Sequence, residues 1–99
     1  MGSGYVGILS VELHFPDSHS LKEKRMHVRS AKAQLSNRVG ASVAEVDHHD
    51  VWQRSRLTLS CVAREHRELE ALLEDAVRYL NGQEYELVSV EREVVVPDE

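Results

Sequence analysis

Four basic residues near the start of the chain have the spacing of one helical flank. They stand at positions i, i+3, i+7 and i+10 and form what we call the basic stripe: Lys22, Arg25, Arg29 and Lys32. On a helix, cations at this spacing can contact successive phosphates of a nucleic acid. A second interpretation is that Glu70 and Glu74, on a later predicted helix, neutralise the same charges. The pattern predicts either a polyanion-binding surface or a set of structural ion pairs.

Trp52 and Arg54 lie close together in a polar segment that we predict to be a loop, residues 47–54. A tryptophan beside an arginine can stack on a nucleic-acid base or anchor a protein partner. The alternative is that Trp52 covers an edge of the hydrophobic core and bonds its indole N–H to the backbone. Because large aromatic side chains are usually well buried, this second interpretation is the favoured one.

The same segment contains residue types that bind metals: Glu45, Asp47, His48, His49 and Asp50. If the strand before the loop continues, Glu45, Asp47 and His49 share one side, which suits a divalent transition ion. No second group of ligands follows in the sequence, and a polar hairpin is usually only hydrated. We therefore predict no metal and no cofactor.

Residue patterns typical of catalytic sites are weak in this sequence. Cys61 is the only cysteine and alternates with Leu57 and Leu59, which predicts a buried thiol rather than a nucleophile. We find no glycine-rich phosphate loop and no serine-centred elbow. Since no nucleophile, base and orienting group can be assembled, we expect that the protein is not an enzyme and has no catalytic residues.

Six elements must position these side chains. Alternation of apolar and polar residues predicts strands over residues 5–14, 42–47, 56–63 and 85–96. A period of 3.6 predicts helices over 21–37 and 65–80. Ser20 and Glu23 fit a capping box at the start of the first helix, and Gly40 fits a cap at its end. Asn81-Gly82 ends the second helix.

The order strand–helix–strand–strand–helix–strand predicts a single α+β domain with a ferredoxin-like fold. Its four-stranded antiparallel sheet should have the spatial order 4-1-3-2, with both helices on one face. The helices should bury Leu21, Val28, Ala31, Leu35 and Val39 from the first, and Leu69, Leu72, Leu73, Ala76, Val77 and Leu80 from the second. The open face should carry Ser10, Glu12, His14, Thr58 and Ser60. It therefore lacks the aromatic platform of an RNA-recognition motif.

Charge is unevenly distributed along the 99 residues, whose total is −5. Residues 20–38 carry a net +5, and residues 64–99 carry a net −7, which suggests an oriented surface field. No apolar run approaches the ~18 residues that span a bilayer, so we expect no membrane association. The start lacks the features of a signal peptide, which favours the cytoplasm. Residues 1–3 fit a remnant of recombinant expression, and we assign them no function.

Two segments carry a recognisable pattern, Ser20-Leu21-Lys22-Glu23-Lys24-Arg25 and Glu45-Val46-Asp47-His48-His49-Asp50-Val51-Trp52-Gln53-Arg54. Together with the rest of the chain they resemble the YlxP-like family of small bacterial proteins of unknown function. The resemblance implies a ferredoxin-like fold in a cytoplasmic protein. Members are often encoded near transcription-termination and translation-initiation factors, which implies RNA- or ribosome-related work. The chain departs at His49 and Ser55, where glutamine and alanine are common; the family has no established catalytic residues to transfer.

We therefore expect a non-enzymatic cytoplasmic module that binds RNA, the ribosome or a protein bound there. Its contact surface should be the first helix with the 47–54 loop. The alternative is a self-associating structural or regulatory protein, a homodimer that uses the open face or a sheet edge such as strand 85–96. The valines at 94–96 of that strand would be an aggregation liability if unpaired. A metal-binding protein or small enzyme is the third hypothesis.

Overall fold

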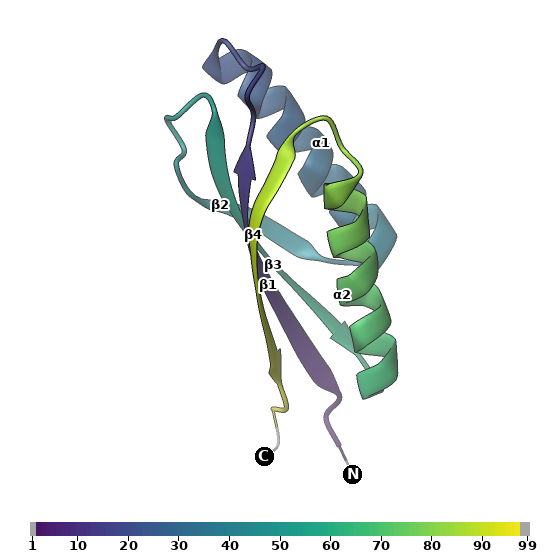
Figure 1. Ribbon diagram of the computed structural model, residues 1–99. Helices are drawn as coiled ribbons and strands as arrows, with labels where there is room; N and C mark the ends of the chain where they lie inside the picture. Colours follow the sequence, from purple (N-terminus) through teal and green to yellow (C-terminus); the bar gives the residue numbers. More distant parts are fainter. Residues whose placement is uncertain (1, 98–99) are drawn as a thin grey trace.

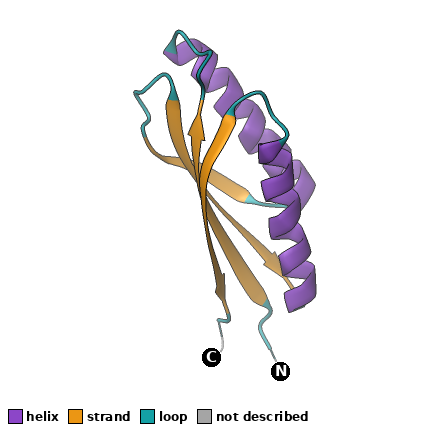
Figure 2. Cartoon of the chain, in the orientation of Figure 1, coloured by secondary structure: helices purple, strands orange, loops and turns teal. Residues whose placement is uncertain are grey.

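The computed structural model describes residues 2–97, in which four antiparallel strands form one sheet and two helices cover one of its faces (Figures 1 and 2). The elements in chain order are β1 Tyr5–His14, α1 Leu21–Val39, β2 Ser42–Asp47, β3 Arg54–Ala63, α2 His66–Asn81 and β4 Glu86–Val95. The sheet has the order β2-β3-β1-β4, so β2 and β4 are its edges. The predicted ferredoxin-like fold and strand order are confirmed.

One difference from the predicted element bounds changes the position of a candidate site residue. β3 begins at Arg54, two residues earlier than predicted, because the ladder with β1 extends to the pair His14–Arg54. Arg54 therefore lies in a strand and not in the loop. α1 continues to Val39, where Gly40 adopts the left-handed conformation (φ 64°) and donates its N–H to Ser36 O. This is the cap predicted for that helix.

The start of α1 is fixed by side chains, which sets the direction in which each of its flanks points. Ser20 is extended, and its Oγ accepts a hydrogen bond from Glu23 N at 3.1 Å. Glu23 in turn accepts from His19 N at 2.9 Å, one residue earlier than in the standard capping box. The predicted cap at Ser20 is therefore confirmed, with a shifted return bond.

The hydrophobic core lies between the helices and the inner face of the sheet. Its main members are Leu9, Val11 and Leu13 of β1, Leu57, Leu59 and Cys61 of β3, Val28, Ala31, Leu35 and Val39 of α1, and Leu69, Leu73, Ala76 and Leu80 of α2. Gly7 lets α2 approach β1, because a Cβ there would lie 3.0 Å from methyl groups of Leu69 and Leu73. Burial raises the pKa of the Cys61 thiol, as expected for a core cysteine.

Three side chains predicted to belong to the core are only partly buried: Leu21, Leu72 and Val77. They lie at the margins of their helical stripes, where the helix surface turns from the sheet toward solvent. On the opposite, open face of the sheet, the predicted polar set is confirmed, with Ser10 and Thr58 hydroxyls 3.1 Å apart. Neither helix within residues 2–97 is long and apolar enough to cross a membrane.

Candidate functional site

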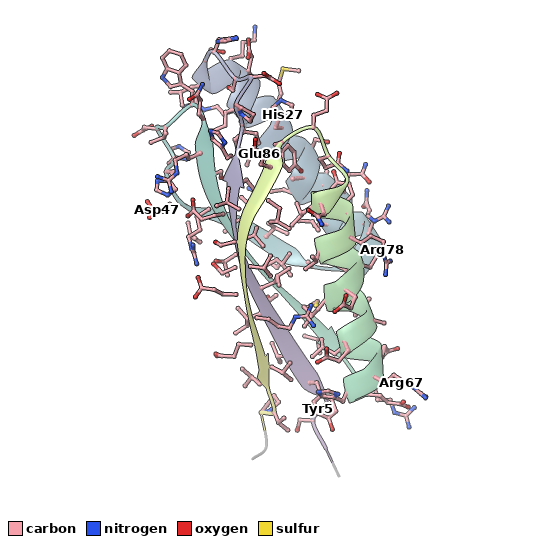
Figure 3. All side chains as sticks on the ribbon, in the orientation of Figure 1. Tyr5, His27, Asp47, Arg67, Arg78 and Glu86 are labelled. Carbon is pink, nitrogen blue, oxygen red and sulfur yellow. The ribbon has the colours of Figure 1, made fainter. Side chains whose placement is uncertain are left out.

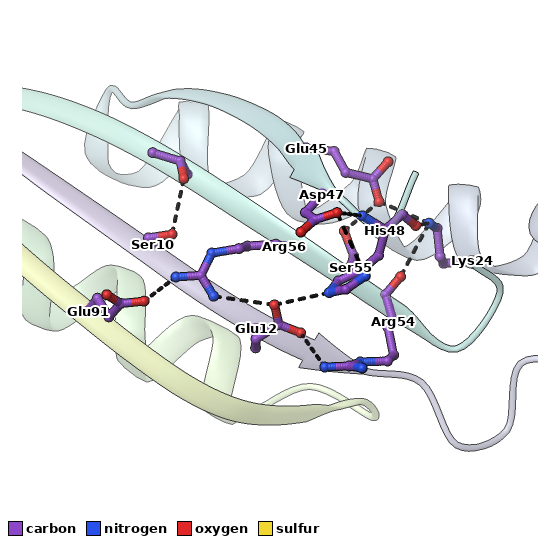
Figure 4. A network of polar contacts seen from close by, with 11 residues as sticks. Ser10, Glu12, Lys24, Glu45, Asp47, His48, Arg54, Ser55, Arg56 and Glu91 are labelled. Carbon is purple, nitrogen blue, oxygen red and sulfur yellow. Dashed lines mark hydrogen bonds and ion pairs between the residues drawn. The ribbon is translucent and has the colours of Figure 1, made fainter. Parts of the chain in front are cut away.

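Lys24 is a fully buried charged side chain on the sheet-facing side of α1. Its ammonium donates to the carbonyl oxygens of His48 at 2.7 Å, His49 at 3.1 Å and Arg54 at 3.3 Å. It also forms an ion pair with Glu45 Oε2 at 2.9 Å (Figure 4). One lysine thus fastens both ends of the loop between β2 and β3 to the first turns of α1.

The Glu45 carboxylate makes three polar contacts on the helix side of β2. Besides Lys24, Ser55 Oγ donates to it at 2.6 Å, and His49 Nδ1 lies 3.0 Å from Oε1. Burial alone would raise the pKa of Glu45, but the hydrogen bonds from Ser55, Lys24 and His49 outweigh it and lower the pKa below its ordinary value. The carboxylate is therefore ionised and already neutralised by Lys24.

The local geometry also separates the residues considered as metal ligands. β2 ends at Asp47, and its pairing with β3 shifts between Glu45 and Asp47, so Glu45, Asp47 and His49 do not continue along one strand. His48 adopts a positive φ of 61°, which turns the chain out of the strand. Within residues 2–97 no group of three or more His, Cys, Asp or Glu side chains is arranged to hold a metal ion.

The loop that carries Trp52 is braced on a second side by the segment before α1. Phe15 N donates to Gln53 O at 2.9 Å, and Gln53 Nε2 donates to Ser18 O at 3.2 Å. Trp52 itself is 50% exposed, so the favoured interpretation that it covers the core is wrong. Lys24 is fully buried and bonds to both ends of the loop, and half of Trp52 remains in solvent on this braced backbone.

Arg54 points away from this surface. Its guanidinium contacts Glu12 on the open face of the sheet at 3.2 Å, and Arg56 contacts the same carboxylate at 3.3 Å (Figure 4). His48 Nε2 lies 3.3 Å from Glu12 as well. Burial acts to raise the pKa of Glu12, but Arg56, His48 and Arg54 lower it below its ordinary value. Arg56 also pairs with Glu91 of β4.

The basic stripe is exposed along its whole length. The acids proposed as its partners are engaged elsewhere: Glu70 and Glu74 each lie 3.1 Å from Arg92 of β4. The ion pair that joins the two helices is Arg38–Asp75 at 3.3 Å, in the last turn of α1. Among the residues that the structure describes, no carboxylate forms an ion pair with any of the four stripe residues. The interpretation that Glu70 and Glu74 neutralise the stripe is wrong.

Three members of the stripe line a groove between α1 and the edge strand β2. This hollow of about 400 Å³ is bounded by Arg25, Val28, Arg29 and Lys32 of α1 and by Ala44, Glu45 and His49. A second hollow of about 510 Å³ shares Lys32 and is bounded by Ala33, Ser36, Gly40, Ala41, Ser42 and Val43. Together they follow β2 along its length, and we call them the basic groove.

The chain is similar in sequence to known proteins. The family of proteins of unknown function DUF503 matches residues 6–92. This chain belongs to that family. It is also 25% identical, over 77 residues, to the uncharacterised protein YlxP of Bacillus subtilis (strain 168), a match that covers 78% of this chain and 84% of YlxP. The resemblance to the YlxP-like family is therefore confirmed.

Two solved structures share the fold of this DUF503 protein. PA3566 from Pseudomonas aeruginosa has a TM-score of 0.54 at 17% identity and matches 97% of this chain and 96% of its own. The flavoprotein MtVAO615 from Myceliophthora thermophila has a TM-score of 0.55 at 12% identity, covering 94% of this chain but only 16% of that one. At such identities the likeness shows the fold alone.

Sequence reasoning missed the role of Lys24, although a signal was present. Lys24 falls on the same helical face as Val28, Ala31 and Leu35, so a lysine occupies a position of the apolar stripe. Its partner Glu45 alternates with Val43 on the helix side of β2. A cation and an anion on two inward faces were therefore the indication of a buried pair.

Proposed function

We propose that this DUF503 protein is a non-enzymatic cytoplasmic module that binds the phosphate backbone of RNA through its basic stripe. The observation that carries the proposal is that these four exposed cations form no ion pair within residues 2–97. The acids of α2 that were the expected partners, Glu70 and Glu74, are engaged by Arg92 of β4, and Asp75 is engaged by Arg38. Cations held on one flank without partners provide the sequence-independent part of nucleic-acid affinity.

The electrostatic balance favours local over long-range attraction. The whole chain is acidic, with a net charge of −5, so distant nucleic acid is weakly repelled. At about 0.15 M salt the Debye length is about 8 Å, which screens charges on the far side of the domain from a ligand on α1. Glu45, the acid that lines the groove, is neutralised by Lys24 at 2.9 Å. A phosphate at the stripe therefore meets a positive local field.

The deciding experiment reverses two central charges of the stripe and compares them with two matched charges elsewhere. Arg25→Glu/Arg29→Glu changes the stripe, whereas Arg64→Glu/Arg67→Glu makes the same change of charge at the opposite end of the domain. Arg64 and Arg67 are exposed and form no ion pair within residues 2–97, and Figure 3 shows Arg67 at the start of α2. Binding of a labelled ribosomal RNA fragment is measured by fluorescence anisotropy at several salt concentrations.

For the wild type we expect affinity to fall roughly 50- to 150-fold between about 50 and 200 mM salt, the slope expected when four phosphates are neutralised. The stripe variant should bind negligibly with a melting temperature close to the wild type, because both side chains are exposed and unpaired. The control variant should lose little. Equal RNA affinity in the stripe variant and the control, or an affinity independent of salt, would contradict the proposal.

A second candidate function is self-association, and one observation favours it. On the open face, Val6 of β1 stands in register with Val62 of β3 and Val95 of β4. Val62 is 67% exposed and Val95 is 38% exposed, and Ile8 extends the row. An apolar row across three strands at the end of a polar sheet face is a surface that a second copy of the chain would cover.

A further inference from the structure

We propose that the basic groove binds RNA as a single strand and that one of its bases stacks on Trp52. This inference rests on the proposed function, because it names the form of RNA that the basic stripe selects. Four features carry it: the position of the cations in a hollow, the unpaired edge of β2, the exposed indole, and the bracing of the loop backbone that carries the indole.

The position of the cations favours a strand over a duplex. Arg25, Arg29 and Lys32 line the hollow between α1 and β2. A-form duplexes present a wide, shallow minor groove and bury their bases, and side chains cannot enter their narrow major groove. A groove bounded by one helix and one strand edge can accommodate one backbone with its bases splayed.

The floor of the groove supplies hydrogen-bonding groups for those bases. Within residues 2–97, β2 pairs with β3 alone, so the N–H and C=O groups on its outer edge have no partner strand there. Ser42 and Ala44, which border the two hollows, are exposed and small, so they leave this edge accessible. Backbone donors and acceptors can pair with base edges that a single strand exposes and a duplex conceals.

Trp52 provides a stacking surface on the loop that adjoins the groove. The loop, residues 48–53, contains His49, which lines the groove, and Lys24 holds its backbone at both ends. A ring on a braced backbone loses little freedom when a base stacks on it, so more of the stacking energy appears as affinity. Base–aromatic stacking contributes roughly 5- to 150-fold per base and tolerates any sequence.

An extended acidic peptide is the rival occupant, since it could add a strand to β2 and place carboxylates on the same cations. Strand addition gains its specificity from pockets for alternate side chains. The apolar residues that line the basic groove offer no deep side-chain pockets: Val28 is buried, and Ala33, Ala41, Val43 and Ala44 are small. The charged contacts come from Arg25, Arg29 and Lys32, which suit a polar anionic strand.

The test uses the fact that Trp52 is the only tryptophan of the chain. Its fluorescence is followed while the full-length protein is titrated with one of four probes. These are oligouridylate, an RNA duplex with the same number of phosphates, inorganic polyphosphate and oligoglutamate. Oligouridylate should quench the fluorescence along the same binding curve that anisotropy gives. The duplex should bind at least about tenfold more weakly without quenching, and polyphosphate should bind without quenching.

Variants separate stacking from charge. Trp52→Ala should weaken binding of labelled oligouridylate roughly 5- to 150-fold, leave the salt slope unchanged and leave polyphosphate binding intact. Trp52→Phe should retain most of the affinity, and Val51→Ala, a control at an exposed neighbour, should change nothing. Far-UV circular dichroism verifies that each variant is folded.

The outcomes distinguish this inference from the proposed function. If oligouridylate binds without quenching and Trp52→Ala binds it as well as the wild type does, the single-strand inference is overturned while polyanion binding stands. A duplex that binds as tightly as the single strand overturns it as well. Oligoglutamate binding more tightly than oligouridylate of equal charge assigns the groove to an acidic peptide. Binding unaffected by Arg25→Glu/Arg29→Glu removes the proposed function itself.

Discussion

Replacing Lys24 with methionine tests whether the buried cation organises the candidate site. The substitution keeps an unbranched side chain of similar length but leaves Glu45 without its ammonium partner. It also leaves the carbonyl oxygens of His48, His49 and Arg54 without their shared donor. A single charge left behind by a broken buried pair costs about 3–5 kcal/mol. Glu45 keeps Ser55 and His49 and is 10% exposed, so we expect the lower end, about 3 kcal/mol.

The loss should depend on pH in a direction that the structure fixes. In the wild type the pKa of Glu45 lies below its ordinary value of 4.5, so its contribution to stability is present above that pH and is lost as the pH falls further. In Lys24→Met, burial is opposed by fewer partners and the pKa of Glu45 rises. Protonation then relieves the unpaired charge, and the difference between variant and wild type should shrink from pH 7 toward about pH 4.

Urea unfolding followed by far-UV circular dichroism measures both the loss of stability and its dependence on pH. Lys22→Met on the exposed basic stripe is the matched control and should change the free energy of unfolding by less than about 0.5 kcal/mol. A domain of this size should lose roughly 12–24 °C in melting temperature for a 3 kcal/mol change. The double variant Lys24→Met/Glu45→Met should be more stable than the sum of the two single losses predicts, since it removes both charges. A loss below about 1 kcal/mol at pH 7, or one that does not vary with pH, would refute this reasoning.

Two further predictions concern packing and association. Leu73→Ala should cost about 2–5 kcal/mol of the free energy of unfolding in urea, because Leu73 is fully buried against β1. Leu72 is partly exposed, so Leu72→Ala should cost about 1 kcal/mol. Equal losses would mean that the apolar face of α2 is wrongly assigned. If the valine row of the open face joins two copies, light scattering at high micromolar concentration should give a dimer mass that Val62→Lys converts to a monomer mass. A monomer mass for the wild type would remove the self-association hypothesis.

The fold could be predicted because its signals are local. Alternation in β1 and β3 and the helical stripes of α1 and α2 are written in consecutive residues, and the caps at Ser20 and Gly40 use side-chain and backbone chemistry within a few positions. The elements β1 and β2 begin and end at the predicted residues. The start of β3 did not, because Arg54 joins the strand only through its pairing with His14, which is distant in sequence.

The candidate site was predictable only in its composition. The sequence shows six basic residues between positions 20 and 38, but the partner of each depends on how α1 and α2 rotate over the sheet. α2 directs Glu70 and Glu74 toward Arg92 of β4, and only Asp75 reaches α1, at Arg38. Exposure of Trp52 likewise depends on tertiary contacts, since the buried Lys24 fixes both ends of the loop and Trp52 lies outside the buried core.

The two segments that carry the family resemblance meet in space, and this divides their residues by role. Ser20 and Glu23 from the first segment cap α1, and Lys24 pairs with Glu45 from the second. Gln53 from the second segment donates to Ser18 O, just before the first. His49 and Ser55, where this chain departs from the common pattern, both contact the Glu45 carboxylate.

Much of the family pattern is thus accounted for by one internal cluster, with no reference to a partner. Among the residues that it does not account for are three exposed ones, Lys22 and Arg25 on the stripe and Trp52 on the loop. Because the cluster ties the loop to the first turns of α1, it holds these outward residues on adjoining elements. A substitution inside the cluster should therefore weaken RNA binding through displacement of Trp52, whereas a substitution on the outer set should weaken binding without loss of stability.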